Sequence, residues 1–345
     1  MDFVDWSISI RNSTVYLAIC ISIPSMALYI AEIVTIVRHK KFHNSFYALF
    51  VMRAIPDLLY VLNSFYAQRL PSIIGSLLYP IYSKFPNWML AMTLFLAGHT
   101  FQANNLVTIF ILLNRLTAII MPIKHEKMWL KLVPLLTIFV FCVPILTCWP
   151  AFKENGIIQL NDSNSTTDRN FIMSEAGVAP YLNYITFICA AFSVIFMIVC
   201  VLLNIATLVA YKLHVKKDGG NGNNAHNFER KLLIYALATF LGHLLVASLF
   251  LIGIFTDMSD PKIMAMLFVY YSLVMDTGTV VLSSWLLLWA SGTFRQQLIK
   301  DFSIIRFTNR ANIRVGAVQG HHRAVGPAIG YQFQNSSVNQ LPTVS

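Results

Sequence analysis

The sequence predicts an all-α integral membrane protein: a bundle of seven transmembrane helices with the N-terminus outside the cell and the C-terminus in the cytoplasm. Three observations lead to this fold class. Of the 345 residues, 57% are hydrophobic and 12% are charged, and the mean hydropathy is +0.63, a balance that a soluble domain could not bury. The apolar residues gather in long stretches, and the basic residues are divided unequally among the connections between them.

Seven apolar stretches each reach the roughly 20 residues that a helix needs to cross a hydrocarbon core. Backbone polar groups in lipid must be paired within their own segment, and the alternating ten-residue pattern of a barrel strand is absent, so each stretch is expected to be a helix. The stretches are Thr14–Val37, Phe46–Tyr66, Trp88–Ile119, Leu132–Phe152, Tyr181–Tyr211, Lys231–Phe255 and Ile263–Trp289.

The distribution of lysine and arginine predicts the orientation. One alternate set of connections, together with the C-terminal tail, carries 18 basic residues, and the other set, in which we count Arg69, carries 6. Cytoplasmic segments are enriched in Lys and Arg, so the richer set is placed inside. The net charge of +10 is then explained by topology and by attraction to anionic inner-leaflet lipid, and it predicts no nucleic acid partner.

Glycosylation sequons agree with this orientation. Asn12, Asn161 and Asn164 each begin an Asn-x-Ser/Thr triplet in a segment placed outside, where the secretory pathway can modify it. Such triplets also arise by chance. A fourth sequon, at Asn335, lies in the cytoplasmic tail and is expected to remain unmodified.

The pattern divides the chain into four regions. A membrane-surface helix is expected after the seventh span, because Phe294, Leu298 and Phe302 recur at helical spacing among basic residues. The end of the chain is rich in Gly, Gln, Asn and Ser and has no hydrophobic period. The regions are an extracellular N-terminus (1–13), the seven-transmembrane domain (14–290), the amphipathic helix (291–310) and a disordered cytoplasmic tail (311–345).

All five cysteines fall within predicted helices. Cys148 and Cys189 lie closest to the extracellular side and could meet in a disulfide, but buried thiols are the simpler interpretation. No structural disulfide is assumed.

A short motif lies at the inner end of the third predicted helix. Arg115, Ala118, Ile119 and Pro122 match the spacing of the Asp-Arg-Tyr-x-Ala-Ile-x-x-Pro-Leu element of rhodopsin-like G-protein-coupled receptors. An arginine at this depth needs a partner, the interface or a cytoplasmic protein, although it could also be an ordinary arginine that reaches out from a helix end. Asn114 replaces the usual acid, and Ser283-Ser284-Trp285 stands where Asn-Pro-x-x-Tyr is expected, so the chain is not a standard rhodopsin-like receptor.

Further motifs give a closer match. His43-Asn-Ser-Phe-Tyr-Ala-Leu-Phe enters the second helix, Asp57 lies within it, Lys127-Met-Trp follows the arginine motif, and Phe294-Arg295 follows the seventh helix. In this combination the chain resembles the nematode serpentine chemoreceptors of class gamma over about residues 14 to 302.

This resemblance implies a chemosensory receptor that binds a small odorant or pheromone-like ligand and signals through a heterotrimeric G protein. It also implies a multi-pass protein of the plasma or ciliary membrane of a sensory neuron. The expected coupling surface joins Arg115 to the basic residues of the neighbouring inner connections, Lys124, Lys127, Lys216 and Lys217.

Ionisable side chains deep in the predicted helices form the candidate ligand site. Counted at 1.5 Å per residue from the helix ends, Asp57, His99, His243 and Asp276 fall within one or two turns of the mid-plane and could face one cavity. Nearer the outside lie three aromatic residues that could line a pocket for a small, partly apolar ligand: Tyr184, Tyr270 and Tyr271.

Simpler explanations compete for these residues. Arg53 and Asp57 are four apart on one helical face, so an internal ion pair accounts for both without a ligand. Asp276 has no such partner nearby in the sequence, and its expected partners are Asp57, through a shared cation or proton, or the two histidines. Each histidine is more simply a hydrogen-bonded packing residue, and the group is a weak metal signal.

Other classes of function find little support. The chain has no Gly-rich phosphate loop, no His-Glu-x-x-His and no Gly-x-Ser-x-Gly, so no enzyme, cofactor or metal site is predicted. A ligand-gated channel or a membrane transporter is the alternative to a receptor. An odd helix count without an inverted repeat disfavours the transporter.

Overall fold

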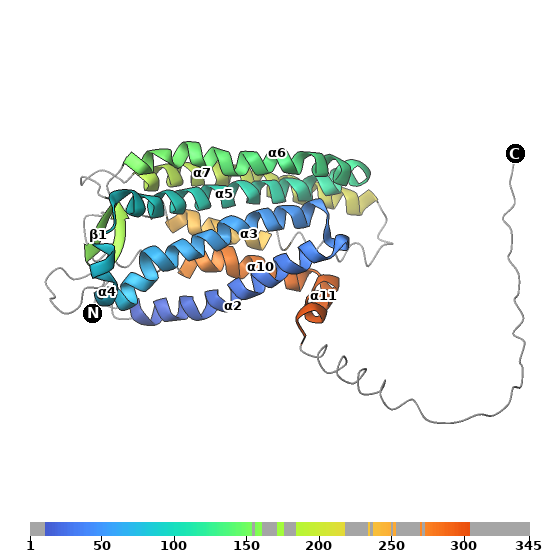
Figure 1. Cartoon of the computed structure of the whole chain (residues 1–345). Helices are drawn as coiled ribbons and strands as arrows, with labels where there is room; N and C mark the ends of the chain where they lie inside the picture. The colour runs from blue at the N-terminus through green and yellow to red at the C-terminus, as the bar shows by residue number, and fades with distance from the viewer. Residues whose placement is uncertain are drawn as a thin grey trace, which may run out of the picture. The chain divides into compact units, whose positions relative to one another are not determined.

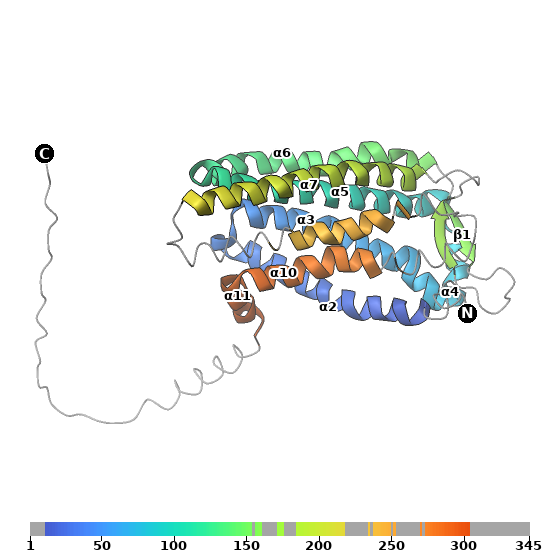
Figure 2. The same cartoon turned by 180° about the vertical axis from the view of Figure 1, so that it is seen from behind.

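The computed structural model describes residues 11–153, 156–160, 171–175, 184–217, 234, 237–249, 251–252, 270 and 273–303. Within residues 1–301, which form one compact unit, long helices run side by side in a single bundle (Figures 1 and 2). A pair of short strands lies at one end of the bundle, which we call the hairpin end. Helix α11 begins at the other, which we call the α11 end.

The long helices are α2 (Arg11–Arg38), α3 (Ser45–Ser64), α5 (Asn87–Ile120), α6 (Pro122–Cys148) and α7 (Tyr184–Lys217). Shorter helices are α4 (Leu70–Tyr82), α10 (Leu282–Ala290) and α11 (Gly292–Phe302). Single turns are η1 (Lys40–Phe42), η2 (Phe65–Arg69), η3 (Trp149–Lys153) and η4 (Thr277–Val281), of which η2 and η4 are π-helical. Residues 237–249 are also helical.

In the described part of the chain, six helical stretches are long and apolar enough to cross a membrane, and residues 237–249 form a shorter apolar helix inside the sixth predicted span. Large apolar side chains cover the outward faces of α6 and α7, among them Leu135, Leu146, Ile195 and Leu202. So much exposed apolar surface would be unstable in water and suits lipid. The prediction of a helical membrane protein is confirmed at this level.

The second membrane-crossing stretch is longer than the sequence predicts. The prediction ends it at Tyr66, whereas α3 continues through η2 and α4 to Tyr82, with a kink at Ile74 inside α4. Pro71 occupies the first turn of α4, directly after the π turn η2, and the carbonyl oxygen of Tyr66 in that turn accepts a hydrogen bond from Oη of Tyr82 at 3.2 Å. Arg69 is buried inside the bundle, so counting it as part of an exposed connection is wrong.

Helix α6 begins ten residues before the predicted span. Pro122 starts it, which is a favoured position for proline, and Met121 is the only residue between α5 and α6. The basic residues Lys124 and Lys127 therefore lie on a helix rather than in a loop, and both are exposed.

Two glycines bring the helix of residues 237–249 against η4. A Cβ added at Gly242 would lie 3.1 Å from Cα of Gly278, and one added at Gly278 would lie 3.0 Å from the carbonyl oxygen of Gly242. Small residues allow such close backbone approach between membrane helices. The contact places His243, which follows Gly242, and Asp276, two residues before Gly278, on adjoining segments.

The strands β1 (Gly156–Leu160) and β2 (Phe171–Glu175) pair antiparallel, with Ile158 opposite Met173. Phe171 and Met173 are buried, and the Phe171 ring lies 5.3 Å from that of Tyr82 in α4. Gly156 approaches α5 so closely that an added Cβ would be 2.5 Å from Cβ of Leu90. The hairpin is thus packed onto α4 and the start of α5.

Candidate functional site

Polar side chains from four separate segments meet inside the bundle, and we call them the central polar cluster. They come from α2, α3, α5 and the helix of residues 237–249, and all are buried. The members are Tyr29, Arg53, Asp57, Asn104, Thr108 and His243.

Asp57 is the acceptor at the centre of this cluster. It accepts hydrogen bonds from Oη of Tyr29, at 3.1 Å, and from Nδ2 of Asn104. Nε of Arg53 lies 3.5 Å from Oδ2 of Asp57, and both side chains are 0% exposed. The predicted ion pair between residues 53 and 57 is confirmed, and it also binds α3 to α2 and α5. Buried polar groups of this kind fix how helices pack, because an unpaired member is costly.

His243 joins the sixth predicted span to the cluster. Nη2 of Arg53 lies 3.1 Å from Nε2 of His243, and Oγ1 of Thr108 lies 3.0 Å from the same nitrogen. A guanidinium can only donate, so Nε2 accepts and the ring proton belongs on Nδ1. This contact therefore requires a neutral imidazole.

Asp276 has a partner that the sequence did not indicate. Oδ2 of Asp276 accepts a hydrogen bond of 2.5 Å from Nη2 of Arg69, and Nη1 of Arg69 donates to Oγ of Ser22 at 3.0 Å. The Phe65 ring lies 4.6 Å from the guanidinium, which supplies a cation–π contact. The expectation that Asp276 pairs with Asp57, His99 or His243 is wrong. The reason is that Arg69 remains in a helix and reaches across to the last predicted span.

Of the other predicted ligand residues, His99 contacts a different helix from Asp276. Nε2 of His99 contacts the carbonyl oxygen of Phe141 at 3.2 Å, so this histidine faces α6 and serves as a packing residue. Tyr270 is half-buried. Tyr184 begins α7, but its side chain, like the whole of Tyr271, lies outside the described residues.

At the α11 end, Arg115 is held against α3. Its guanidinium lies 3.8 Å from the ring centre of Phe46, a cation–π contact. The neighbouring Asn114 donates to Oγ of Ser45 at 3.1 Å, and the backbone N–H of Ser45 donates to Glu126 of α6 at 2.7 Å. Asn114, in the place of the acid of the rhodopsin-like motif, therefore joins α5 to the start of α3.

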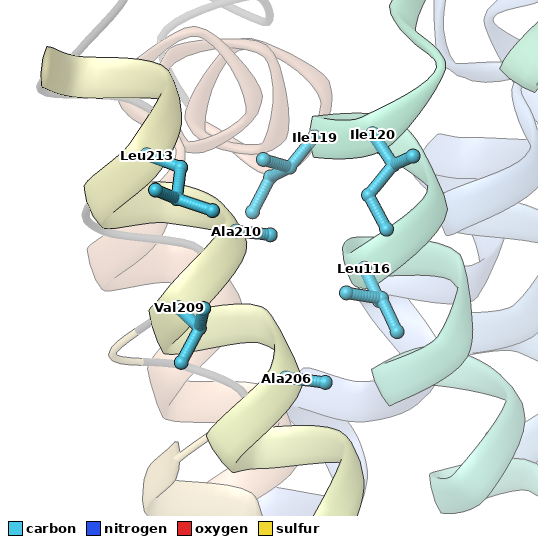
Figure 3. A pocket seen from close by; sticks show the side chains of 7 residues that line it. All are labelled: Leu116, Ile119, Ile120, Ala206, Val209, Ala210 and Leu213. Carbon is cyan, nitrogen blue, oxygen red and sulfur yellow. The ribbon is translucent and has the colours of Figure 1, made fainter.

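An apolar groove of about 550 Å³ lies beside Arg115 on the α11 end. Figure 3 shows its lining side chains facing one another from α5 and α7. They are Leu116, Ile119, Ile120, Ala206, Val209, Ala210 and Leu213. Lys124 and Lys127 are exposed on the adjoining turns of α6. Lys216 and Lys217 end α7, and their side chains lie outside the described residues.

Helix α11 is bound to the connection between α2 and α3. Nε2 of His39 donates to Oδ2 of Asp301 at 2.8 Å, Nε2 of Gln297 donates to Oδ1 at 3.0 Å, and Lys41 donates to Gln297 at 2.8 Å. Burial raises the pKa of Asp301, but the hydrogen bonds from His39 and Gln297 outweigh it and hold the pKa below its ordinary value. The contact thus favours an ionised carboxylate.

Cys148 and Cys189, both in the described part of the chain, are buried thiols, as the simpler interpretation predicts. Among the sequons, Asn12 lies in the first turn of α2, and its side chain is not described. Asn161, Asn164 and Asn335 lie outside the described residues.

The sequence missed several members of the buried clusters: Ser22, Tyr29, Arg69, Asn104 and Thr108. Two signals could have found some of them. Asn104 and Thr108 are four residues apart in an apolar helix, which puts them on one face. Arg69 lies two residues before Pro71, and a proline in a first helical turn indicates that the following residues are helical, so Arg69 could be recognised as part of a helix.

The apolar exterior and the long apolar helices define a multi-pass helical membrane protein. The Srg family chemoreceptor model matches residues 15–298, and the chain belongs to this family. The resemblance to class gamma receptors is therefore confirmed, and the family is one of chemoreceptors rather than of enzymes.

Three relatives from Caenorhabditis elegans are similar to parts of the chain. Serpentine receptor class gamma-16 is 25% identical over 261 residues, 72% of this chain and 74% of the relative. Class gamma-9 is 26% identical over 159 residues, 45% and 47% of the two chains, and class gamma-5 is 24% identical over 116 residues, 32% and 36%. The chain spans about a third to a half of the last two relatives.

Proposed function

We propose that this protein is a chemosensory receptor of a sensory neuron, in its plasma or ciliary membrane, that binds a small odorant or pheromone-like ligand and signals through a heterotrimeric G protein. The observation that carries the proposal is the match of the chemoreceptor family over residues 15–298. The bundle has seven transmembrane helices in this proposal, the sixth being residues 231–255. The N-terminus and the hairpin end are extracellular.

The central polar cluster supports a receptor because it joins four segments through a few mutually dependent contacts. Asp57 contacts groups from α2 and α5, and Arg53 contacts His243. A ligand that favours one arrangement of these helices shifts the whole bundle toward it, by as much as its affinity differs between the two arrangements. Small movements at the hairpin end can therefore reach the α11 end.

The α11 end is the proposed G-protein surface. It combines an apolar groove between α5 and α7 with the basic residues Arg115, Lys124 and Lys127. Such a surface fits a partner segment with an apolar face and acidic neighbours. Helix α11, which leaves the bundle direction in both views, lies on the inner membrane surface in this arrangement (Figures 1 and 2).

Replacement of Arg115 by Ala tests the coupling role. Loss of an interface arginine typically costs about 2 kcal/mol or more, so ligand-evoked G-protein activation should fall by about 30-fold while surface expression persists. Lys84→Ala is the matched control, because it removes an exposed basic residue at the hairpin end. Full activation by the Arg115 variant, with expression equal to the parent, would count against the coupling surface.

The competing proposal is a ligand-gated channel or a transporter. Expression in cells that lack the relevant G proteins separates the two classes. A receptor gives no ligand-evoked response there and regains it when the G protein is supplied. Ligand-evoked current in those cells would favour the channel.

A further inference from the structure

The Arg69–Asp276 ion pair is joined by one hydrogen bond and leaves one polar atom unpaired on each side chain. Nη2 of Arg69 donates to Oδ2 of Asp276, while Nε of Arg69 and Oδ1 of Asp276 have no hydrogen-bond partner in the described part of the chain. Both side chains are only 2% exposed. Buried donors and acceptors are nearly always paired, so two on one ion pair need an explanation.

We propose that this ion pair is the polar anchor of the ligand site and takes a neutral group that both donates and accepts a hydrogen bond, such as a primary amide or a protonated carboxylic acid. The inference rests on the proposed function, since it assumes that the chain binds a small ligand. It assigns the chemical class of that ligand.

Both unpaired atoms belong to the same ion pair: Nε is bonded to the carbon that carries Nη2, and Oδ1 to the carbon that carries Oδ2. Nε and one terminal nitrogen of a guanidinium point along the same edge, and this edge is the one that forms two parallel bonds to a carboxylate. Here Nη2 is bonded to Oδ2, while Nε and Oδ1 lack partners in the described part of the chain. The unpaired donor and the unpaired acceptor therefore belong to the two groups that this one bond joins. One donor–acceptor group can join both.

Charge selects a neutral ligand over an ionised one. Arg69 and Asp276 cancel each other, so a neutral group leaves the buried site neutral, whereas a carboxylate or an ammonium would add an uncompensated charge. An ester or a tertiary amide satisfies only the arginine, because it can accept but cannot donate. The hydrogen-bond donor of the ligand thus distinguishes the molecules that satisfy both side chains from those that satisfy only Arg69.

The backbone beside the pair is π-helical on both sides. Arg69 is the last residue of η2, and Asp276 directly precedes η4, so each partner borders a π-helical turn. Single π turns inside α-helices are frequent at functional sites.

An apolar surface adjoins the anchor on the same π turn. Tyr66 packs against Tyr82, with ring centres 5.2 Å apart, and this cluster includes Phe85 and Phe171, the first residue of β2. A ligand held by its polar group at Arg69 would place an alkyl chain next to aromatic side chains. The site thus favours amphiphilic molecules with a small polar head.

The test measures binding to the purified full chain in lipid nanodiscs, read as a shift of the thermal unfolding midpoint. The probes are primary alkyl amides of six to ten carbons and their N,N-dimethyl counterparts. Primary amides should produce a given shift at about tenfold lower concentration, the effect of one additional buried hydrogen bond. Equal potency of the two series, or no shift with any primary amide, overturns the inference.

Two variants locate the effect. Arg69→Met combined with Asp276→Leu removes both charges together, a change that buried ion pairs often tolerate, and should abolish the preference for primary amides. Asp276→Asn leaves Arg69 charged and should shift the preference to the carboxylates of the same chain length. Asp301→Asn at the α11 end is the control and should bind as the parent does. Retention of the parent's preference by both site variants overturns the inference.

Failure of the proposed function has a different signature. It appears as the absence of G-protein-dependent signals from the parent with any compound, whatever the amides do in the binding measurement.

Discussion

Removal of Asp57 should destabilise the bundle more than removal of Asp57 and Arg53 together. Asp57→Ala deletes the acceptor of Tyr29 and Asn104 and leaves the Arg53 charge buried without its carboxylate. Breaking a buried pair in this way costs about 3–5 kcal/mol, whereas replacing both members with apolar residues is often neutral. Asp57→Leu with Arg53→Met should therefore be the more stable of the two variants.

The buried cysteines provide the assay. Cys148, Cys189 and Cys200 are buried, whereas Cys20 and Cys142 are exposed and can first be replaced by Ala. A thiol-reactive fluorogenic dye then reports unfolding on heating. At about 2 °C per kcal/mol for a chain of this size, the single variant should lose about 6–10 °C.

The comparison of the single and double variants tests whether the Arg53–Asp57 pair organises the core. A coupling energy of about 2 kcal/mol or more between residues 53 and 57 is expected for a buried pair whose members touch. If the double variant is as unstable as the sum of the two single variants, the pair does not organise the core.

Three further predictions concern the ends of the bundle. Gly156→Val should release the hairpin from α5, because even an added Cβ would lie 2.5 Å from Cβ of Leu90. We expect faster proteolysis between the two strands and a destabilisation of about 1–3 kcal/mol. Gly292→Ala is the control and should leave stability unchanged, because an added Cβ there would have nothing within 4 Å. The pKa of Asp301 is lowered by its contacts, so the ionised carboxylate stabilises the docking of α11 fully above the ordinary pKa of 3.8. Spin-label distances should show α11 separating from His39 as the pH falls through the lowered pKa. The variant Asp301→Asn should show no such pH dependence. Mass spectrometry should find a glycan on Asn161 or Asn164, and protection of both from extracellular glycosidase in intact cells would contradict the orientation.

The sequence identified the class of the protein because the membrane constraint acts on composition. A helix in lipid needs about 20 apolar residues whatever its neighbours are, so helix type and most spans could be read without a structure. Ends were harder. The extension of α3 to Tyr82 and the start of α6 at Pro122 depend on prolines in first turns, where sequence alone does not distinguish a break from a beginning.

In the candidate site, too, contacts within one helix were predictable from the sequence and contacts between helices were not. Arg53 and Asp57 were predicted to pair because a spacing of four fixes neighbours within one helix. The partner of Asp276 was not, because Arg69 is 207 residues away and no local rule links them. The histidines looked equivalent by depth, yet His243 turns to the central polar cluster and His99 to a carbonyl of α6.

The sequence by itself determined the family, the helical membrane architecture and the pairs that lie within one helix, since each depends on composition or on local spacing. Only the tertiary structure decided which polar groups from different helices meet. In lipid the apolar faces of helices are nearly interchangeable, so rotation and contact depend on buried hydrogen bonds and on close approaches such as Gly242 against Gly278. These act between residues that are far apart in the chain, and their geometry exists only once the helices are packed.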